Sequence, residues 1–462
     1  MLSPISNEVT HCDINHFENN PMLHLPSDSE TTRIILVRHG RSTFNDQQRY
    51  QGSSDDAVLN TKGWYQARCV GEALQGLTID AIYTSPLQRT TQTTQAITSV
   101  LNRIKQFAPQ QNVMRRGSLR EYDVENGWST TATLSRTSTL VDGAAGFSQL
   151  ETEQIPVISC DRLREIELPA WQGRPYQEVR TQEADAYRRW LTDPHEFQMM
   201  ANQRNDEGVG ICSTDSTRMV YPVINLYARA QNIWDDILPR YQCRTVLMVS
   251  HGGTNHALLS TALGLSPRFH HRLQQSNGGI SVVDYSPSEM TAQLRSLNLT
   301  QHLGESLPKL KAGKRGLRLL LLPVASDSPH SGGELTDLEK TRIAQMLDTV
   351  PIAYSLTQAG NYAQALTQDL LRDRPDIVQL QVQHAEFSTQ WHQALTRVTS
   401  TSDLSTGLVV APVCTLQQLI AEAIGLQYNA SKAIALHPGT LSVLHYPVGD
   451  HPPVLQAMNI LS

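Results

Sequence analysis

The chain alternates short apolar runs with longer stretches in which apolar residues recur at helical spacing. The runs "RIILVRHG" (33–40) and "RTVLMVSHGG" (244–253) are typical of strands buried on both faces of a parallel sheet. "DAIYTSP" (80–86), "GGISVVDYS" (278–286) and "LRLLLLPVAS" (317–326) predict three more strands.

Helices are predicted between these runs. The first begins at "NTKGWYQARCVGEALQGL", where Asn60 or Thr61 is suited to cap it. The others span residues 87–101, 181–193, 225–238 and 254–265. Strands that alternate with helices predict a three-layer α/β/α fold with a mostly parallel sheet.

Three segments break this pattern and suggest a domain organisation. Residues 1–30 read as a flexible arm, and residues 106–153 as a surface insertion or, alternatively, a lid over the site. Residues 306–316 concentrate Lys, Gly and Pro and read as a linker. We therefore expect a first domain at 31–305 and a second at 317–462.

The second domain repeats part of the first. "TVLMVSHGGTNHALLSTALGL" (245–265) resembles "TGLVVAPVCTLQQLIAEAIGL" (406–426), with Thr254 opposite Thr415, and similar apolar strands follow both. The pattern predicts an internal duplication.

The second copy lacks the polar residues of the first. Pro412-Val413 replaces His251-Gly252, and Pro323-Val324-Ala325 replaces Arg38-His39-Gly40. Gly360 is the nearest counterpart of Arg89. We expect the second domain to be a degenerate, non-catalytic copy that serves packing, dimerisation or closure over substrate.

The two histidines lie where chemistry is expected in such a fold. Ligands of open parallel sheets bind at the carboxyl ends of the strands, and "LVRHG" and "MVSHG" both end in His-Gly. His39 and His251 are therefore expected side by side. Arg38 and Arg89 are suited to phosphate oxygens, and Gly40 and Gly252 leave room for main-chain N–H groups beside an anion.

These residue types suit phosphoryl transfer without a metal or cofactor. A neutral imidazole attacks phosphorus, arginines and a second, protonated histidine stabilise the charge, and a carboxylic acid such as Glu165 protonates the leaving group. No sequence motif of a metal site is present.

"LVRHGRSTFN", "YTSPLQRTTQT", "LREIEL" and "VSHGG", in this order, resemble the histidine phosphatase superfamily, which has the phosphoglycerate-mutase-like fold. The resemblance covers about residues 33–286. It implies His39 as the nucleophile, Glu165 as the proton donor, and a phosphate pocket of Arg38, Arg89 and His251.

The same resemblance implies further contacts to substrate. Asn45 and the amide of Gly252 would contact phosphate, and Gln51 and Gly52 would lie near the substrate. Arg41 departs from the family pattern, which more often has Glu or Gln there. Its added positive charge favours a second anionic group on the substrate.

"LREIELPAWQG", "RRWLTDPHEF" and "LQQSNGGISVVDY" resemble more narrowly the 2-carboxyarabinitol 1-phosphate phosphatases of plants and their cyanobacterial relatives. That resemblance implies hydrolysis of phosphorylated sugar acids or of sugar bisphosphates that inhibit Rubisco, such as xylulose 1,5-bisphosphate. Two alternatives stay open. One is a phosphoglycerate mutase, although the long insertion precedes Glu165 instead of following it. The other is a protein that only binds a phosphorylated ligand.

Composition narrows the class of partner. The chain of 462 residues has 39% hydrophobic and 18% charged residues, which is typical of a globular protein. A net charge of −6 gives no reason to expect nucleic acid or an anionic membrane. Six scattered cysteines indicate reduced thiols and a cytoplasmic location. We expect a small phosphorylated substrate, and a homodimer is possible.

Overall fold

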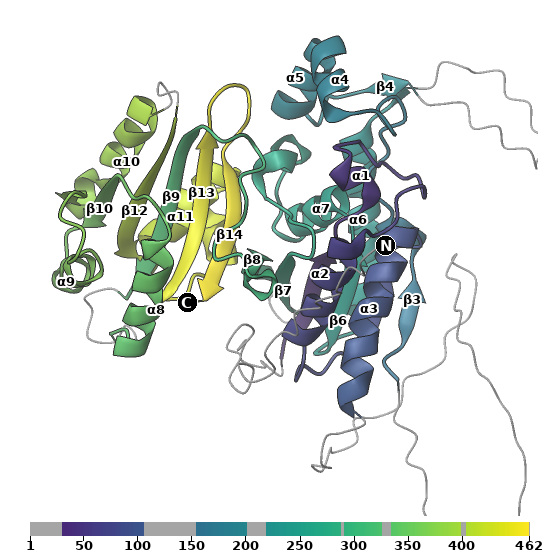
Figure 1. Ribbon diagram of the computed structural model, residues 1–462, viewed down its shortest axis with the longest axis horizontal. Coiled ribbons are helices and arrows are strands. Elements are labelled where there is room, and N and C mark those ends of the chain that lie inside the picture. The colour runs from purple at the N-terminus through teal and green to yellow at the C-terminus, as the bar shows by residue number, and fades with distance from the viewer. Residues whose placement is uncertain are drawn as a thin grey trace, which may run out of the picture.

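The computed structural model describes residues 30–105, 154–200, 219–287, 291–325, 334–398 and 403–461. We call residues 30–305 the first half, 306–315 the connecting segment and 316–461 the second half. One sheet of 12 strands runs through both halves in the order β11-β10-β12-β9-β13-β14-β8-β7-β1-β6-β2-β3 (Figure 1). The predicted flexible arm and insertion fall on residues 1–29 and 106–153, outside the described residues.

In the first half, four parallel strands are followed along the sheet by two antiparallel ones. The parallel strands are β1 (Thr32–Arg38), β6 (Thr245–Ser250), β2 (Ala81–Thr84) and β3 (Val157–Ser159). The antiparallel strands are β7 (Ile280–Ser286) and β8 (Thr291–Leu299). A separate pair of short strands is formed by β4 (Met199–Met200) and β5 (Met219–Val220).

The second half has the same arrangement of strands. Its parallel strands are β9 (Gly316–Val324), β12 (Leu404–Pro412), β10 (Tyr354–Gln358) and β11 (Val378–Val382). Its antiparallel strands are β13 (Thr440–Pro447) and β14 (Val454–Leu461). The expected fold class, a duplicated α/β architecture, is confirmed. The predicted boundary at 306–316 remains a prediction, because the sheet continues across it.

Helices cover both faces of the sheet, as the three-layer prediction requires. In β1, Ile34 and Leu36 face one core while Ile35 and Val37 face the other, because successive side chains of a strand alternate. One face of the first half is covered by α2 (Thr61–Ala73) and α3 (Gln88–Lys105), and the other by α6 (Pro222–Arg240) and α7 (Gly252–Ala262).

The remaining helices are shorter or belong to the second half. The first half also contains α1 (Thr43–Asp46), α4 (Tyr176–Gln182), α5 (Ala184–Thr192) and the 3-10 turns Asp161–Leu163, Pro267–Arg272 and Gln301–Leu303. The second half contains α8 (Asp337–Asp348), α9 (Asn361–Leu370), α10 (His384–Val398), α11 (Val413–Ile424) and the turn Tyr428–Ala433. Asn60 caps α2, as expected, by accepting from the N–H of Gly63.

The strand registers test the sequence comparison between the copies. Arg38 pairs with Ser250 in the first half, and the equivalent pair in the second half is Pro323 with Ala411. Ser281 and Ser442 accept from the main chain of Asn298 and Asn459 respectively, which fixes the remaining alignment. These pairings place Pro323 and Val324 in the positions of Arg38 and His39.

One part of that comparison was wrong. The hydroxyls of Thr84 and Thr94 lie 2.9 Å apart, and those of Thr357 and Thr367 lie 3.0 Å apart, so these two pairs are equivalent. Counting from either threonine places Tyr362, not Gly360, opposite Arg89. The sequence comparison missed this alignment because the segment between the first two strands is longer in the first half, from β1 to β2, than in the second, from β9 to β10.

The halves are joined edge to edge by β8 and β14 (Figure 1). Leu297 pairs antiparallel with Met458, its own counterpart in the duplication. A pairing between equivalent residues defines a pseudo-twofold axis at this point. Because β8 and β14 are antiparallel, the carboxyl ends of the parallel strands face one edge of the sheet in the first half and the opposite edge in the second.

Candidate active site

Two histidines meet at the carboxyl ends of β1 and β6. These strands are adjacent and parallel, so the residues that follow them, His39 and His251, reach the same crevice. The centroids of the two rings lie 5.3 Å apart and the ring planes are inclined by 62°. His39 is 1% exposed and His251 is fully buried. The structure thus brings together the two imidazoles that the sequence placed at matching strand ends.

His39 is held in one tautomer. Its Nδ1 lies 2.7 Å from the carbonyl oxygen of Gly40, and since a carbonyl only accepts, Nδ1 carries the proton. The lone pair is therefore on Nε2. Burial, and then the charges of Arg38 and Arg89, lower the pKa of His39 well below its usual range. His39 is consequently a neutral imidazole with a free ring nitrogen.

Gly40 is required for this arrangement. A Cβ added there would lie 2.3 Å from the carbonyl oxygen of Gly63 in α2, a contact no side chain tolerates. The amide of Gly40 donates to the hydroxyl of Thr93 in α3 at 3.1 Å. The turn after β1 is thus fixed against α2 and α3.

His251 is oriented by Ser85, which follows β2. Its Nε2 lies 2.8 Å from the Ser85 hydroxyl, and its Nδ1 is buried without a partner among the described residues. Burial, then the charges of Arg89 and His39, lower the pKa of His251 well below its usual range. With protein groups alone around it, His251 is neutral, which differs from the protonated state we expected. A phosphate dianion beside it would raise this pKa.

Arg89 is fully buried at the start of α3. Its Nη1 donates to the carbonyl of Ser54 at 2.8 Å and its Nη2 to that of Gly52 at 3.0 Å, while Nε has no partner. Burial lowers the pKa of Arg89 to about 10, with Glu165 opposing, so the guanidinium stays charged at neutral pH. The carbonyl of Gly52 therefore helps to position Arg89, a role beyond the predicted proximity of Gly52 to the substrate.

Arg38 approaches from β1. Its Nη1 donates to the carbonyl of Gln275 at 2.9 Å, and its Nε is buried without a partner. The guanidinium packs against Gly252, where an added Cβ would lie 3.4 Å from its Cζ. Burial lowers the pKa of Arg38, although a guanidinium remains charged at neutral pH. Gly252 begins α7, so the helix N-terminus faces this cation-rich crevice.

Glu165 docks on the same helix N-terminus. Its Oε1 accepts from the N–H of Thr254 at 3.1 Å and from its own neighbour Ile166 at 2.9 Å, and its Oε2 accepts from Gly253 at 3.3 Å. A Cβ on Gly253 would lie 2.7 Å from Oε1. The carboxylate is thus seated by backbone N–H groups at a position without a side chain. Arg229, which is partly buried, donates to the carbonyls of Arg164 and Glu165 and holds the chain there.

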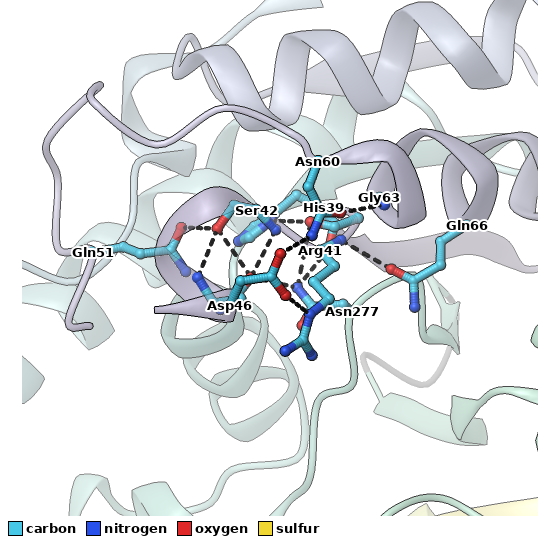
Figure 2. Close-up of polar contacts among 11 residues, drawn as sticks. His39, Arg41, Ser42, Asp46, Gln51, Asn60, Gly63, Gln66 and Asn277 are labelled. Carbon is cyan, nitrogen blue, oxygen red and sulfur yellow. Dashed lines mark hydrogen bonds and ion pairs between the residues drawn. The ribbon is translucent and has the colours of Figure 1, made fainter. Parts of the chain in front are cut away.

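Asn45 and Gln51 belong to a hydrogen-bond network around α1. Figure 2 shows its members Ser42, Gln51 and Asn277. The Asn45 side-chain oxygen accepts from the main chain of Ser42 at 3.1 Å and from the Asn277 amide at 3.0 Å. The Ser42 hydroxyl also donates to Gln51 at 2.9 Å. Asn277 further donates to the carbonyl of His39 at 3.1 Å. Both predicted residues thus support the segment that carries His39.

Arg41 is paired within the protein. Its guanidinium forms an ion pair with Asp46, which also accepts from Asn60, and Figure 2 shows the Asp46 carboxylate facing both. The side chains of Arg41 and Asp46 are 39% and 47% exposed. Much of the positive charge that we assigned to substrate binding is therefore balanced by Asp46.

Comparison with known proteins agrees with this geometry. A family model of the histidine phosphatase superfamily (branch 1) matches residues 34–127 and 116–298, more than half of the chain. The chain belongs to the histidine phosphatase superfamily.

Relatives within this superfamily are distant. The chain is 30% identical over 315 residues to "2-carboxy-D-arabinitol-1-phosphatase" of Triticum aestivum, over 67% of this chain and 49% of that protein. It is 30% identical over 257 residues to "Probable 2-carboxy-D-arabinitol-1-phosphatase" of Arabidopsis thaliana, over 56% of this chain and 39% of that protein. It thus spans less than half the length of these relatives. A phosphoserine phosphatase structure from Entamoeba histolytica is 22% identical, covering 59% of this chain and 99% of that one, at a TM-score of 0.38, too low to argue from.

A cavity of about 310 Å³ adjoins this histidine phosphatase site. Arg38, Glu165 and Gly252 line it, whereas the buried rings of His39 and His251 lie outside its lining. The cavity therefore meets the site on the side of the proposed proton donor.

Several residues of the site were missed by sequence reasoning. Ser85, Thr93, Asn277 and Arg229 orient the predicted residues through hydrogen bonds. Ser85 directly follows a predicted strand next to the one that carries His251, which was the available signal. The others come from distant segments that only the fold brings near.

The described residues give three further findings. They contain no group of three or more His, Cys, Asp or Glu side chains placed to hold a metal ion. Among the helices so described, none is long and apolar enough to cross a membrane. Cys69, Cys160, Cys243 and Cys414 are free thiols.

Proposed function

We propose that this chain is a phosphomonoester hydrolase that works through a phosphohistidine on His39. One observation carries the proposal: a neutral imidazole with a free Nε2 stands beside two guanidinium groups that form no ion pair in the described part of the chain. Two guanidinium groups opposed by one carboxylate, Glu165, leave an excess of positive charge at a helix N-terminus. Such an excess favours an anionic ligand, and phosphate matches the planar donors of arginine. The predicted roles of the other site residues follow from this.

In the first step, the lone pair of His39 Nε2 forms a bond to phosphorus while the bond from phosphorus to the leaving oxygen breaks. Glu165, as the carboxylic acid, gives its proton to that oxygen. Arg38, Arg89 and His251 hold the phosphoryl oxygens and stabilise their charge. The proton on Nδ1 of His39 stays on the ring and continues to donate a hydrogen bond to the carbonyl of Gly40.

In the second step, Glu165 acts as a base. Its carboxylate takes a proton from water, the water oxygen bonds to phosphorus, and the bond from phosphorus to Nε2 breaks. Inorganic phosphate leaves, and His39 and the protonated Glu165 are restored. The position of Glu165 beside the cavity supports both of its roles, because leaving group and water would reach phosphorus from that side.

The substrate class we propose is a small phosphorylated sugar or sugar acid, such as 2-carboxyarabinitol 1-phosphate or a sugar bisphosphate like xylulose 1,5-bisphosphate. The relatives named after the first compound support it. A cavity of about 310 Å³, lined by apolar side chains and by several polar ones, is also of a size for one small ligand. Removal of Rubisco inhibitors is the corresponding physiological proposal.

The test is phosphate release from sugar-acid phosphates, sugar bisphosphates, phosphoserine and phosphoglycerates by wild type and His39→Ala. We expect turnover by wild type, a loss of at least about 10³-fold in the variant, and a labelled phosphoenzyme that is stable in alkali and labile in acid. His392→Ala, an exposed histidine of the second half, is the matched control and should keep full activity.

Two results would replace the proposal. Interconversion of 3- and 2-phosphoglycerate without net phosphate release would make the protein a mutase. Tight binding of phosphorylated ligands with no release and no phosphoenzyme would make it a binding protein.

A further inference from the structure

The topology brings two segments from outside the first half to the proposed site. Since β8 runs parallel to β1, it ends at the edge where His39 lies, and the connecting segment 306–315 begins there. The loop 448–453 between β13 and β14 reaches the same edge for the same reason. Arg188 of α5 pairs with Asp450 of that loop at 3.5 Å.

Both segments line the cavity beside the site. One wall is formed by Arg38, Glu165 and Gly252, and another by Lys311 and Ala312 of the connecting segment with His451 and Pro452 of the loop. A leaving group that Glu165 protonates would therefore extend toward Lys311 and the second half.

Lys311 is held next to Arg38 without a balancing acid. Its ammonium donates to the carbonyl of Gln275, the same oxygen that accepts from Arg38. The charge of Glu305 raises the pKa of Lys311, but Glu305 forms an ion pair with Lys309 at 2.7 Å. In the described part of the chain, no carboxylate forms an ion pair with Lys311. Although Lys311 is an exposed residue, burial of its amino group and then the charge of Arg38 lower its pKa well below the usual range, which disfavours the charged form. An anion bound between this amino group and Arg38 would raise the pKa of Lys311 and stabilise both positive charges.

The same cavity has polar atoms that no protein group satisfies. Two buried side-chain atoms of Gln275, Oε1 and Nε2, lack a partner among the described residues, and Gln275 is 3% exposed. The same is true of the buried atoms Nε2 of His256 and Nδ1 of His270. Buried polar atoms are rarely left unpaired, so a ligand with several hydrogen-bonding groups is the natural partner. The cavity thus offers hydrogen-bonding partners to a polar, anionic leaving group, beside apolar walls that include Trp190 and Leu191.

We propose that Lys311 binds a second anionic group, a carboxylate or a second phosphate, on the leaving-group portion of the substrate, and that the connecting segment thereby sets substrate specificity. This inference rests on the proposed function for the location of the first phosphate. It also gives the second half a role: it holds the connecting segment and the loop 448–453 against the site.

The test compares ligands that differ in one group. In the full chain carrying His39→Ala, so that ligands are not hydrolysed, calorimetry measures the affinities for 3-phosphoglycerate and glycerol 3-phosphate. These share a skeleton and differ by a carboxylate. Fructose 1,6-bisphosphate against fructose 6-phosphate forms the second arm, which tests a second phosphate. We expect the doubly anionic ligand to bind more tightly in at least one arm.

Lys311→Met should remove that preference by weakening the binding of the doubly anionic ligand about 20-fold, the effect expected from the loss of one charge-assisted hydrogen bond. The singly phosphorylated partner should change by less than about twofold. Lys311→Arg, which retains the charge, should restore most of the preference. Lys314→Met, an exposed lysine of the same segment that does not line the cavity, is the matched control.

Absence of any preference in either arm, or equal weakening of both ligands by Lys311→Met, would overturn the inference. These results are separable from the hydrolase proposal. A preference that depends on Lys311 in a protein that releases no phosphate would sink only the hydrolase. Phosphate release that depends on His39 but is insensitive to Lys311 with every doubly anionic substrate would sink only the Lys311 site.

Discussion

Asn298 of β8 and Asn459 of β14 occupy the same position in the two halves, and each has a positive φ, 50° and 57° respectively. The amide of Asn298 donates to the carbonyl of Gln456, and that of Asn459 to the carbonyl of Arg295, both at 2.7 Å. Gln456 and Arg295 are equivalent as well, so the two bonds are related by the pseudo-twofold axis. Hydrogen bonds specific to asparagine thus join the halves.

Asn459→Ala should lower the free energy of unfolding by about 2–4 kcal/mol. The change removes the bond to Arg295, leaves the main chain of His437 without its acceptor at 3.2 Å, and puts alanine at a φ that asparagine tolerates better. Asn298→Ala should cost a similar amount, because its bonds are the counterparts. Urea unfolding measures both.

Asn225→Ala, at an exposed position in α6, is the control and should change stability by less than about 0.5 kcal/mol. If the two interface variants unfold like this control, the asparagine pair does not hold the halves together. A second, separate transition in either variant would show that the halves have become independent.

The fold was readable from the sequence where burial is complete. β1, β6 and β9 are buried on both faces and so appear as continuous apolar runs, and the helices show a clear apolar stripe. β14 was missed because Gln456 and Asn459 interrupt its apolar pattern. Both side chains are buried, and each makes a hydrogen bond to the first half, to Gln274 and Arg295 respectively, which no local pattern encodes.

The residues of the candidate site also fall into two groups, those that the sequence predicted and those that only the fold brings together. His39 and His251 were predictable because each ends a buried strand, and parallel strands end at one edge. Gln275 and Lys311 were not. Gln275 reaches Arg38 only because β7 pairs antiparallel with β1, and Lys311 only because the connecting segment follows β8 at the same edge of the sheet. Arg41 was predictable as a cation, but its pairing with Asp46 depends on the conformation of α1.

Ser85→Ala should lower kcat/KM about tenfold. The Ser85 hydroxyl lies 2.8 Å from Nε2 of His251 and accepts from the N–H of Leu87 at 3.4 Å, so Ser85 holds the ring of His251 in place. Loss of one such orienting hydrogen bond is worth about 1–1.5 kcal/mol. Steady-state kinetics with p-nitrophenyl phosphate measure the effect.

The companion measurement is a double substitution. In a His251→Ala background, Ser85→Ala should have no further effect on kcat/KM, because the site residue that Ser85 orients is gone. Additive losses would mean that Ser85 acts on something other than His251.

Gly253→Ala should displace Glu165, because the new Cβ would lie 2.7 Å from Oε1. We expect about a 100-fold loss of kcat with glycerol 3-phosphate, whose alkoxide must be protonated as it leaves. With p-nitrophenyl phosphate, whose leaving group needs no proton, phosphoenzyme formation should be nearly normal. Its hydrolysis should be slow, and stopped-flow absorbance would show a burst of p-nitrophenol.

Glu165→Gln provides the comparison for this variant. It should reproduce the same selectivity between leaving groups, and adding Gly253→Ala to it should change little. Equal loss with both substrates would indicate that Gly253→Ala damages the phosphate pocket or the N-terminus of α7 instead of the carboxylate.

Stability should fall as the pH drops below about 6.5, because buried histidines are held neutral in the fold. Burial lowers the pKa of His302 to about 4, although the hydrogen bond to the carbonyl of Gly278 at 2.8 Å opposes this. The unfolded chain, with a histidine pKa of about 6.5, binds the proton first. This contribution is therefore complete above about pH 6.5 and is lost as the pH falls toward 4. The pKa values of His39, His251 and His256 are lowered in the same direction.

His302→Gln isolates one of these groups, since glutamine supplies an N–H to the Gly278 carbonyl but does not titrate. Between pH 6 and 5, its free energy of unfolding should fall less steeply than that of wild type, by up to about 1.4 kcal/mol per pH unit. His392 has the opposite sign, because the hydrogen bond to Glu422 raises its pKa and its contribution is lost as the pH rises. His392→Gln should therefore not flatten the acid limb, and identical slopes in wild type and His302→Gln would show that His302 is already protonated in the fold.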